Sequence, residues 1–164
     1  MDNRTLHPAP LTADAFAPWG EVLSADGPHD ALINEGRCAR FHDRATLDFA
    51  QGRAGVSIFR AQAAVLPHAF DLVERHPLGS QAFVPMTAEP FLVIVAPDEG
   101  GRPGRPRAFV TAPGQGVNYR RGVWHGVLTP LGPTGLFAVI DRVGPGSNLE
   151  EHRYATPWTV TADG

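Results

Sequence analysis

The chain has 164 residues and a mass of 17.6 kDa, and 43 % apolar with 19 % charged residues is the composition of an ordinary globular domain. All 14 basic residues are arginine, which excludes a Schiff-base lysine, a Ser-Lys dyad and a P-loop ending in Gly-Lys-Ser/Thr. A formal charge of -3, without a long run of like charges, argues against nucleic acid as a partner. We therefore expect one domain over residues 1–164.

Cysteine usage and hydropathy indicate the compartment. Cys38 is the single cysteine, so neither an intrachain disulfide nor a cysteine-rich zinc site can form. The first 16 residues contain no apolar core of a signal peptide, and the longest apolar run, residues 91–96, is far too short to span a membrane. We expect a soluble, cytoplasmic protein.

The first predicted elements are two short helices. Thr12 is a good N-cap for a helix over residues 13–17, because Pro18 and Gly20 end it promptly. A second short helix is predicted over residues 46–51.

The rest of the chain predicts strands, because 18 glycines and 16 prolines divide it into segments too short for a helical bundle. We expect strands over residues 21–24, 37–41, 55–63, 69–76, 81–85, 91–96, 107–111, 116–120, 126–131 and 136–142. Residues 99–107 and 144–147 have the composition of loops, the second followed by a polar tail. The predicted fold is mainly β, a barrel or sandwich of about ten short antiparallel strands.

Residues 74–86, ERHPLGSQAFVPM, carry the first group of chemically active side chains. The His-Pro-Leu-Gly-Ser sequence predicts a hairpin loop, which would place Glu74, His76 and Gln81 on one face of a sheet. A carboxylate, an imidazole and an amide would then converge. The alternative is structural, with Glu74 paired to an arginine and His76 capping a turn.

Residues 114–126, GQGVNYRRGVWHG, carry the second group. Gly122 permits a tight turn, after which His125 begins a strand and can point into a barrel mouth. A histidine that follows Trp124 can equally be a hydrogen-bonded core residue.

Together these segments resemble the two motifs of the cupin superfamily. Glu74-x-His76-x4-Gln81 occupies the place of His-x-His-x4-Glu, and Gly114-x5-Arg120-x-Gly122-x2-His125 that of Gly-x5-Pro-x-Gly-x2-His. The resemblance implies a cupin-like barrel with a metal held by Glu74, His76, Gln81 and His125. Because Gln81 is a neutral ligand, weak metal binding or a metal-free site is expected.

More specifically, nearly the whole chain resembles the ureidoglycolate lyase family. The quoted segments carry the likeness, supported by Phe41-His42-Asp43, Phe59-Arg60-Ala61-Gln62 and Ile140-Asp141-Arg142. The family implies a cupin-like homodimer that releases urea from (S)-ureidoglycolate to give glyoxylate during allantoin breakdown, with a divalent metal, nickel or manganese, and no organic cofactor. A shortage of lysine gatekeepers on the strand edges also favours a homodimer.

Cleavage of this substrate needs proton transfer and no covalent intermediate, which suits a chain without lysine. The proton-transfer candidates are His76, His125 and Glu74, and their individual roles stay open.

A fixed cation or convergent N–H donors are needed for the substrate carboxylate, and arginine offers a two-pronged geometry suited to it. Arg60 is the first candidate because its strand is otherwise apolar, Arg121 and Arg142 follow, and Arg75 should point to the opposite face from Glu74. The side chains that could bind the ureido group are Asn118 and Tyr119, and His42 and Asp43 form a local pair or reach another subunit. Two other classes stay open: a non-catalytic binder of small acids and a metal-dependent cupin isomerase or oxygenase.

Overall fold

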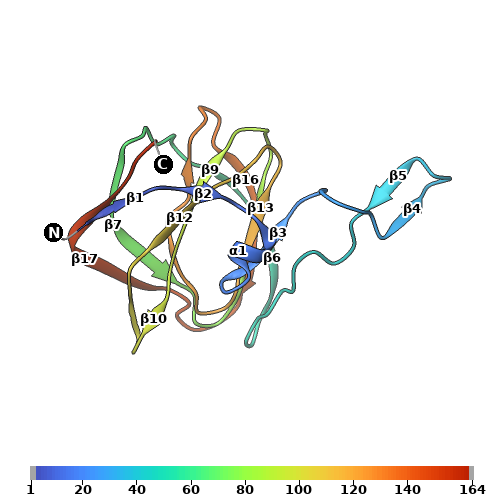
Figure 1. Ribbon diagram of the computed structural model, residues 1–164. Helices are drawn as coiled ribbons and strands as arrows, with labels where there is room; N and C mark the ends of the chain where they lie inside the picture. Colours follow the sequence, from blue (N-terminus) through green and yellow to red (C-terminus); the bar gives the residue numbers. More distant parts are fainter. Residues whose placement is uncertain (1–2, 163–164) are drawn as a thin grey trace.

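The computed structural model describes residues 3–162 and is built mainly from β-strands in two curled sheets (Figure 1). This confirms the predicted mainly-β, cupin-like class. Within residues 3–162 no helix has the length and apolar character needed to cross a membrane.

The larger sheet has eight strands and carries Glu74 of the first motif and His125 of the second. Its path runs β1-β17-β7-β14-β9-β12-β2, and β15 pairs with β9 beside that path. The strands are β1 (Thr5–Leu6), β2 (Ala9–Pro10), β7 (His68–Arg75), β9 (Phe91–Ala96), β12 (Arg107–Val110), β14 (Trp124–Gly126), β15 (Thr129–Pro130) and β17 (Glu150–Val160).

The N-terminal segment joins the two ends of this sheet. β1 pairs in parallel with β17, and β2, three residues later, pairs in parallel with β12. These two pairs depart from the all-antiparallel arrangement that we expected. The curled sheet thereby encloses its own apolar cluster, which includes Leu6, Ile94 and Trp158.

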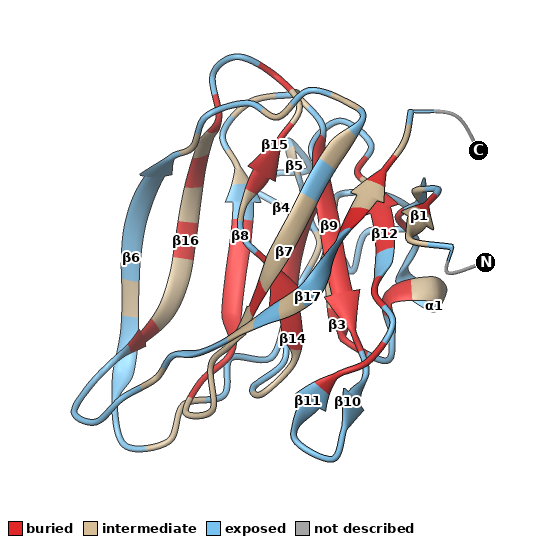
Figure 2. Ribbon diagram, turned by 90° about the vertical axis from the view of Figure 1, so that its left-hand side faces the viewer, coloured by how far each residue is buried: buried red, intermediate tan, exposed pale blue. Residues whose placement is uncertain are grey.

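The smaller sheet has five strands in the order β3-β13-β8-β16-β6. They are β3 (Gly20–Leu23), β6 (Arg53–Arg60), β8 (Gln81–Pro85), β13 (Gly116–Tyr119) and β16 (Leu136–Val143). The main core lies between the sheets, where Phe83, Val95 and Val139 meet. Figure 2 shows β9 buried along its length, whereas β6, an edge strand, is mostly exposed.

One of the two predicted helices forms. α1 (Ala13–Phe16) has Thr12 as its N-cap, whose hydroxyl accepts from the Ala15 amide at 3.2 Å. The helix predicted over residues 46–51 is wrong. Its backbone is used elsewhere, since the Asp48 amide donates to the Ser80 hydroxyl at 2.9 Å and Phe49 forms a β-bridge with Gly79.

The hairpin predicted across residues 76–80 is also wrong. β7 pairs with β14 and β17, while β8 pairs with β13 and β16, so the connection crosses from one sheet to the other. It is tied to other loops, because the Leu78 amide donates to Asn148 Oδ1 at 2.7 Å. The strand predicted over residues 126–131 is divided between β14 and β15.

The segment predicted as a polar tail is the longest strand, β17. Its register on β7 shifts between Arg153 and Trp158, around Pro157, which cannot donate a backbone hydrogen bond. Two further hairpins complete the described elements. One is β10 (Asp98–Glu99) with β11 (Arg102–Pro103), and the other is β4 (Ala31–Ile33) with β5 (Cys38–Arg40), which projects from the body as an arm (Figure 1).

Candidate active site

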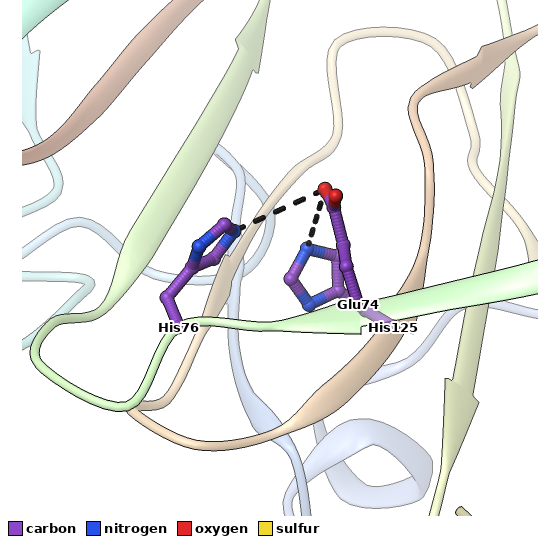
Figure 3. A group of neighbouring side chains, drawn as sticks. All are labelled: Glu74, His76 and His125. Carbon is purple, nitrogen blue, oxygen red and sulfur yellow. Dashed lines mark ion pairs between the residues drawn. The ribbon is translucent and has the colours of Figure 1, made fainter. Parts of the chain in front are cut away.

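The structure brings Glu74, His76 and His125 together at one end of the space between the sheets (Figure 3). Glu74 lies on β7 directly opposite His125 of β14, and His76 follows two residues after Glu74. Glu74 Oε1 lies 3.7 Å from His125 Nε2 and 3.9 Å from His76 Nε2. These three residues, called the triad below, are the predicted catalytic residues.

Backbone carbonyls fix the orientation of both imidazoles. His76 Nδ1 lies 2.8 Å from the Asn148 carbonyl oxygen, and His125 Nδ1 lies 3.1 Å from that of Val123. A carbonyl can only accept, so each Nδ1 is the donor and each neutral ring directs its Nε2 lone pair at Glu74. Both Nε2 atoms are buried and have no hydrogen-bond partner within residues 3–162.

This set of donor atoms fits a cation. Two imidazole lone pairs and a carboxylate face one another, and all three are acceptors, so a shared positive charge would relieve their mutual repulsion. The ligand atoms lie within 4.8 Å of one another, close enough to share one ion. Carbonyl oxygens behind each Nδ1 are the usual second partners of metal-bound histidines.

The surroundings of the triad favour the ionised form of Glu74. When His125 and His76 carry a proton on Nε2 in place of a shared cation, the hydrogen bond from His125 lowers the pKa of the Glu74 carboxyl below the ordinary value. The charges of both rings add to this, and partial burial opposes it. The ring of Tyr119 stacks on that of His125, with centroids 4.2 Å apart and planes 11° apart. Burial raises the pKa of the Tyr119 phenol, and the Glu74 carboxylate raises it further.

Gln81 approaches the triad from the opposite sheet. It lies directly across from Tyr119, so both side chains point into the space between the sheets. Its amide nitrogen donates to Asp141 Oδ2 at 3.1 Å, and its Oε1 is buried with no partner within the described chain. Gln81 therefore faces the same space as Tyr119, whose ring stacks on that of His125. This arrangement arises without the hairpin from which a convergence with Glu74 and His76 was predicted.

Asn118 is not brought to the triad. Asn118 and Tyr119 are neighbours in β13, so their side chains point to opposite faces and that of Asn118 lies on the outer face of the smaller sheet. There its Nδ2 donates to Glu21 Oε2 at 3.0 Å and to the Thr46 carbonyl at 3.1 Å. These contacts hold the segment around residue 46 on the sheet, a structural role in place of the predicted contact with substrate.

The arginine candidates do not converge on the triad either. Arg60 is exposed on the outer face of edge strand β6, which corrects the expectation that it is buried. As predicted, Arg75 points away from Glu74; its guanidinium pairs with Glu150 at 2.6 Å and Asp98 at 2.8 Å. Arg121 donates to the Pro77 carbonyl at 2.6 Å at the protein surface.

Arg142 is buried, but its guanidinium is already used. It donates to the carbonyl oxygens of Ala50 at 2.5 Å, Gln51 at 2.7 Å and Pro145 at 2.5 Å. These contacts support a structural role that joins two loops, in place of the predicted binding of substrate.

Replacement of Arg142 separates these roles. Arg142→Met keeps most of the apolar stem but leaves three carbonyls without their donor, so we expect the free energy of unfolding to fall by about 3 kcal/mol. Urea denaturation gives this value, and the kcat/KM of the folded variant should stay near that of the parent chain. Unchanged stability with a large rise in KM would instead support the predicted role of Arg142 in substrate binding.

His42 and Asp43 lie at the base of the arm. The His42 amide donates to Asp30 Oδ2, and its ring accepts from Arg40, both at 2.8 Å. The predicted local pair is therefore replaced by contacts with Asp30 and Arg40.

Asp141 lies beside Gln81, whose amide donates to it, although the motif spacing does not predict this position. It occurs in the sequence within Ile140-Asp141-Arg142. The alternation of β16 contained the signal, since Asp141 follows the same face as the core residues Phe137 and Val139.

Comparisons with known proteins agree along nearly the full chain. Residues 3–161 match a family model described as "Ureidoglycolate lyase". The chain is 61 % identical over 152 residues to a "Ureidoglycolate lyase" of Rhodobacter capsulatus, covering 92 % of this chain and 94 % of the relative. It is 55 % identical to one of Chelativorans sp., covering 92 % and 93 %, and 52 % identical to "Ureidoglycolate lyase 2" of Rhizobium meliloti, covering 92 % and 94 %.

Proposed function

Because this chain belongs to the ureidoglycolate lyase family, we propose that the triad carries out the reaction of that family. The chain is an enzyme, and its function is that of a ureidoglycolate lyase. The observation that carries the assignment of the site is the convergence of two imidazole Nε2 atoms on Glu74 Oε1. This membership leaves the non-catalytic binder and the isomerase or oxygenase without support.

The proposed reaction is the cleavage of (S)-ureidoglycolate to glyoxylate and urea, in allantoin breakdown. The substrate carbon bears both the hydroxyl and the ureido nitrogen. When the C–N bond breaks, the hydroxyl loses its proton, its oxygen becomes the aldehyde oxygen of glyoxylate, and the nitrogen leaves with the bonding pair and gains a proton. The oxygen and nitrogen are attached to one carbon, so a single base can serve both transfers.

Glu74 is the proposed base for both transfers. Its Oε1 faces both imidazoles, and its second carboxylate oxygen can take the hydroxyl proton and return it to the leaving nitrogen. No covalent intermediate is needed, in agreement with a chain that lacks lysine. The two carbonyl-anchored imidazoles hold the reacting end of the substrate against this carboxylate.

A divalent metal, nickel or manganese, would be held by Glu74, His76 and His125, and when bound it would lower the pKa of the substrate hydroxyl. The arginine candidates support this proposal. Arg60 and Arg75 point away from the triad, Arg121 donates to the Pro77 carbonyl at the surface, and Arg142 is held by three carbonyls. The ion, or convergent N–H donors, would then bind the substrate carboxylate. Gln81 Oε1, predicted as a fourth ligand, is available either to the ion or to substrate.

Direct identification of products tests the function. Purified protein with racemic ureidoglycolate should release glyoxylate and urea in equal amounts, with about half of the racemate consumed. Release of ammonia would assign the chain to amide hydrolysis. Thermal stabilisation by the compound without turnover would support binding alone.

We also propose that one domain spans residues 1–164 and that it forms a homodimer through the outer face of the smaller sheet. Val56 and Ile58 on edge strand β6 are 72 % and 59 % exposed, and Val84 on β8 is 37 % exposed. The register places Ile58, Ala138 and Val84 in one row across three strands. A continuous apolar face of this kind is suited to a second copy of the same face about a twofold axis. A cytoplasmic location also stays a prediction, supported by the lone Cys38.

Light scattering at micromolar concentration should give twice the chain mass of 17.6 kDa. Ile58→Asp places a charge at the centre of the proposed interface and should yield the monomer. Val65→Asp is the matched control, because Val65 is 80 % exposed but lies outside the sheet, and it should stay dimeric. A parent chain that scatters as a 17.6 kDa species would contradict the proposal.

A further inference from the structure

We propose that Asp141 and Gln81 form a subsite that binds the ureido group and makes the enzyme specific for ureido acids. This inference rests on the proposed function, because it assigns the half of the substrate that the triad does not hold. The Asp141 carboxylate belongs neither to the two motifs nor to the triad, so the subsite adds a new group to the site.

The two sheets present facing sets of polar groups. On the larger sheet, Glu74 and His125 are direct cross-strand partners. On the smaller sheet, Tyr119 and Gln81 are direct partners, and the antiparallel register that pairs Ile140 with Ala82 brings Asp141 opposite Gln81. Amide, phenol and carboxylate therefore lie side by side, and the stacking of Tyr119 on His125 brings this set against the triad.

The subsite offers hydrogen-bond acceptors with unused capacity. Gln81 is only 6 % exposed; its Nε2 is used by Asp141, and its buried Oε1 has no partner among residues 3–162. An unpaired buried acceptor is costly, so it is expected to find a donor when the site is filled.

The Asp141 carboxylate is likewise incompletely paired. Within the described residues it accepts from Gln81 and forms no ion pair, since the adjacent Arg142 points to the other face. Its cross-strand partner on β6 is Gly55, and the Val143 side chain fills the space that a side chain at position 55 would take. A carboxylate has about four lone-pair positions, so further N–H donors can be accepted.

A ureido group matches these acceptors. It is planar and carries three N–H donors, and one N–H from each nitrogen can point in parallel at a carboxylate, as the guanidinium of arginine does. With the hydroxy-acid end at the triad, the ureido end would extend toward the smaller sheet and meet Asp141 and Gln81 Oε1. A hydroxy acid without the ureido group would leave these acceptors unpaired, which gives the basis for selectivity.

The test uses two ligands that each keep one end of the substrate. N-carbamoylglycine keeps the ureido group and lacks the hydroxyl, whereas glycolate keeps the hydroxy acid and lacks the ureido group. Asp141→Asn preserves shape but turns one acceptor into a donor. We expect the Kd of N-carbamoylglycine and the KM for ureidoglycolate to rise at least about tenfold, the size expected for a charged hydrogen bond. The Kd of glycolate should change less than about twofold.

Asp71→Asn is the matched control, because Asp71 is paired with Arg153 at the surface and should change neither constant. Equal weakening of both ligands by Asp141→Asn would overturn the subsite, as would a fall in kcat at constant KM. Circular dichroism shows whether Asp141→Asn has folded. If it has not, Asp141→Ser, which removes the carboxylate without adding a bulky donor, is tested in its place, and the same changes in Kd and KM are expected. Binding of these ligands does not depend on turnover, so a chain that fails to cleave ureidoglycolate contradicts the proposed function and leaves this test intact.

Discussion

His76→Ala and His125→Ala should each lower kcat/KM by at least about a hundredfold while the fold is retained, the lower range for loss of a group that acts on the reacting atoms. Each substitution removes one of the two Nε2 atoms directed at Glu74 Oε1. The steady-state kinetics of ureidoglycolate cleavage measure the effect, and circular dichroism of the same samples measures the fold.

His68→Ala is the matched control for both variants. His68 begins the same strand, β7, and its ring stacks on Phe70 far along the strand from Glu74, so its loss should leave kcat/KM nearly unchanged. His125 is almost fully buried, and its ring packs on Tyr119. If His125→Ala unfolds, the core-histidine interpretation gains support, and His125→Gln, which keeps volume and polarity, becomes the deciding variant.

Removal of divalent metal should have the second large effect, a fall in kcat/KM of about a hundredfold or more, because Lewis-acid stabilisation contributes several kcal/mol. We expect purified protein to contain little metal, since three protein ligands and a neutral Gln81 bind it weakly. Added nickel or manganese should then raise activity, and a chelator should lower it. Elemental analysis gives the metal content per chain.

A binding measurement makes this prediction independent of turnover. The same ions should raise the Tm of the parent chain in a concentration-dependent manner, and they should raise that of Glu74→Gln much less, because the variant loses the anionic ligand. Full turnover by chain shown to be free of metal would contradict the metal proposal. His76 and His125 would then act directly on protons.

The common orientation of Glu74 and His76 could be predicted from the sequence because it depends on short-range rules. Two residues separated by one share a face of a strand, so Glu74 and His76 point the same way whichever strand lies beside them. His125 was reached only through the motif spacing, since nothing in its own segment distinguishes a ligand from a core histidine. The cap at Thr12 and the opposite orientation of Arg75 follow from equally local rules.

The errors come from pairings between distant segments. Glycine and proline in residues 77–79 are compatible with a hairpin, but the cross-strand partners of β7 and β8 lie in separate sheets, and the loop is fixed by Asn148 instead. Arg60 was expected to be buried because its neighbours are apolar; they are apolar on an edge strand whose outer face is open. The segment of β17 has a polar composition because one of its faces is exposed. Its other face carries the buried residues Trp158 and Val160, which the composition does not reveal.

The pairing of β17 has a consequence for the order in which the protein can be made. Glu74 stands on a strand bordered by β14 on one side and by residues 150–160 on the other, and β17 is in turn bordered by residues 5–6. During synthesis, the strand that holds Glu74 therefore lacks one neighbour until residues near position 160 have left the ribosome. Only then can residues 5–10 join β17 to β12. The ring of strands behind the site is thus completed late, by contacts between segments about 150 residues apart in the sequence.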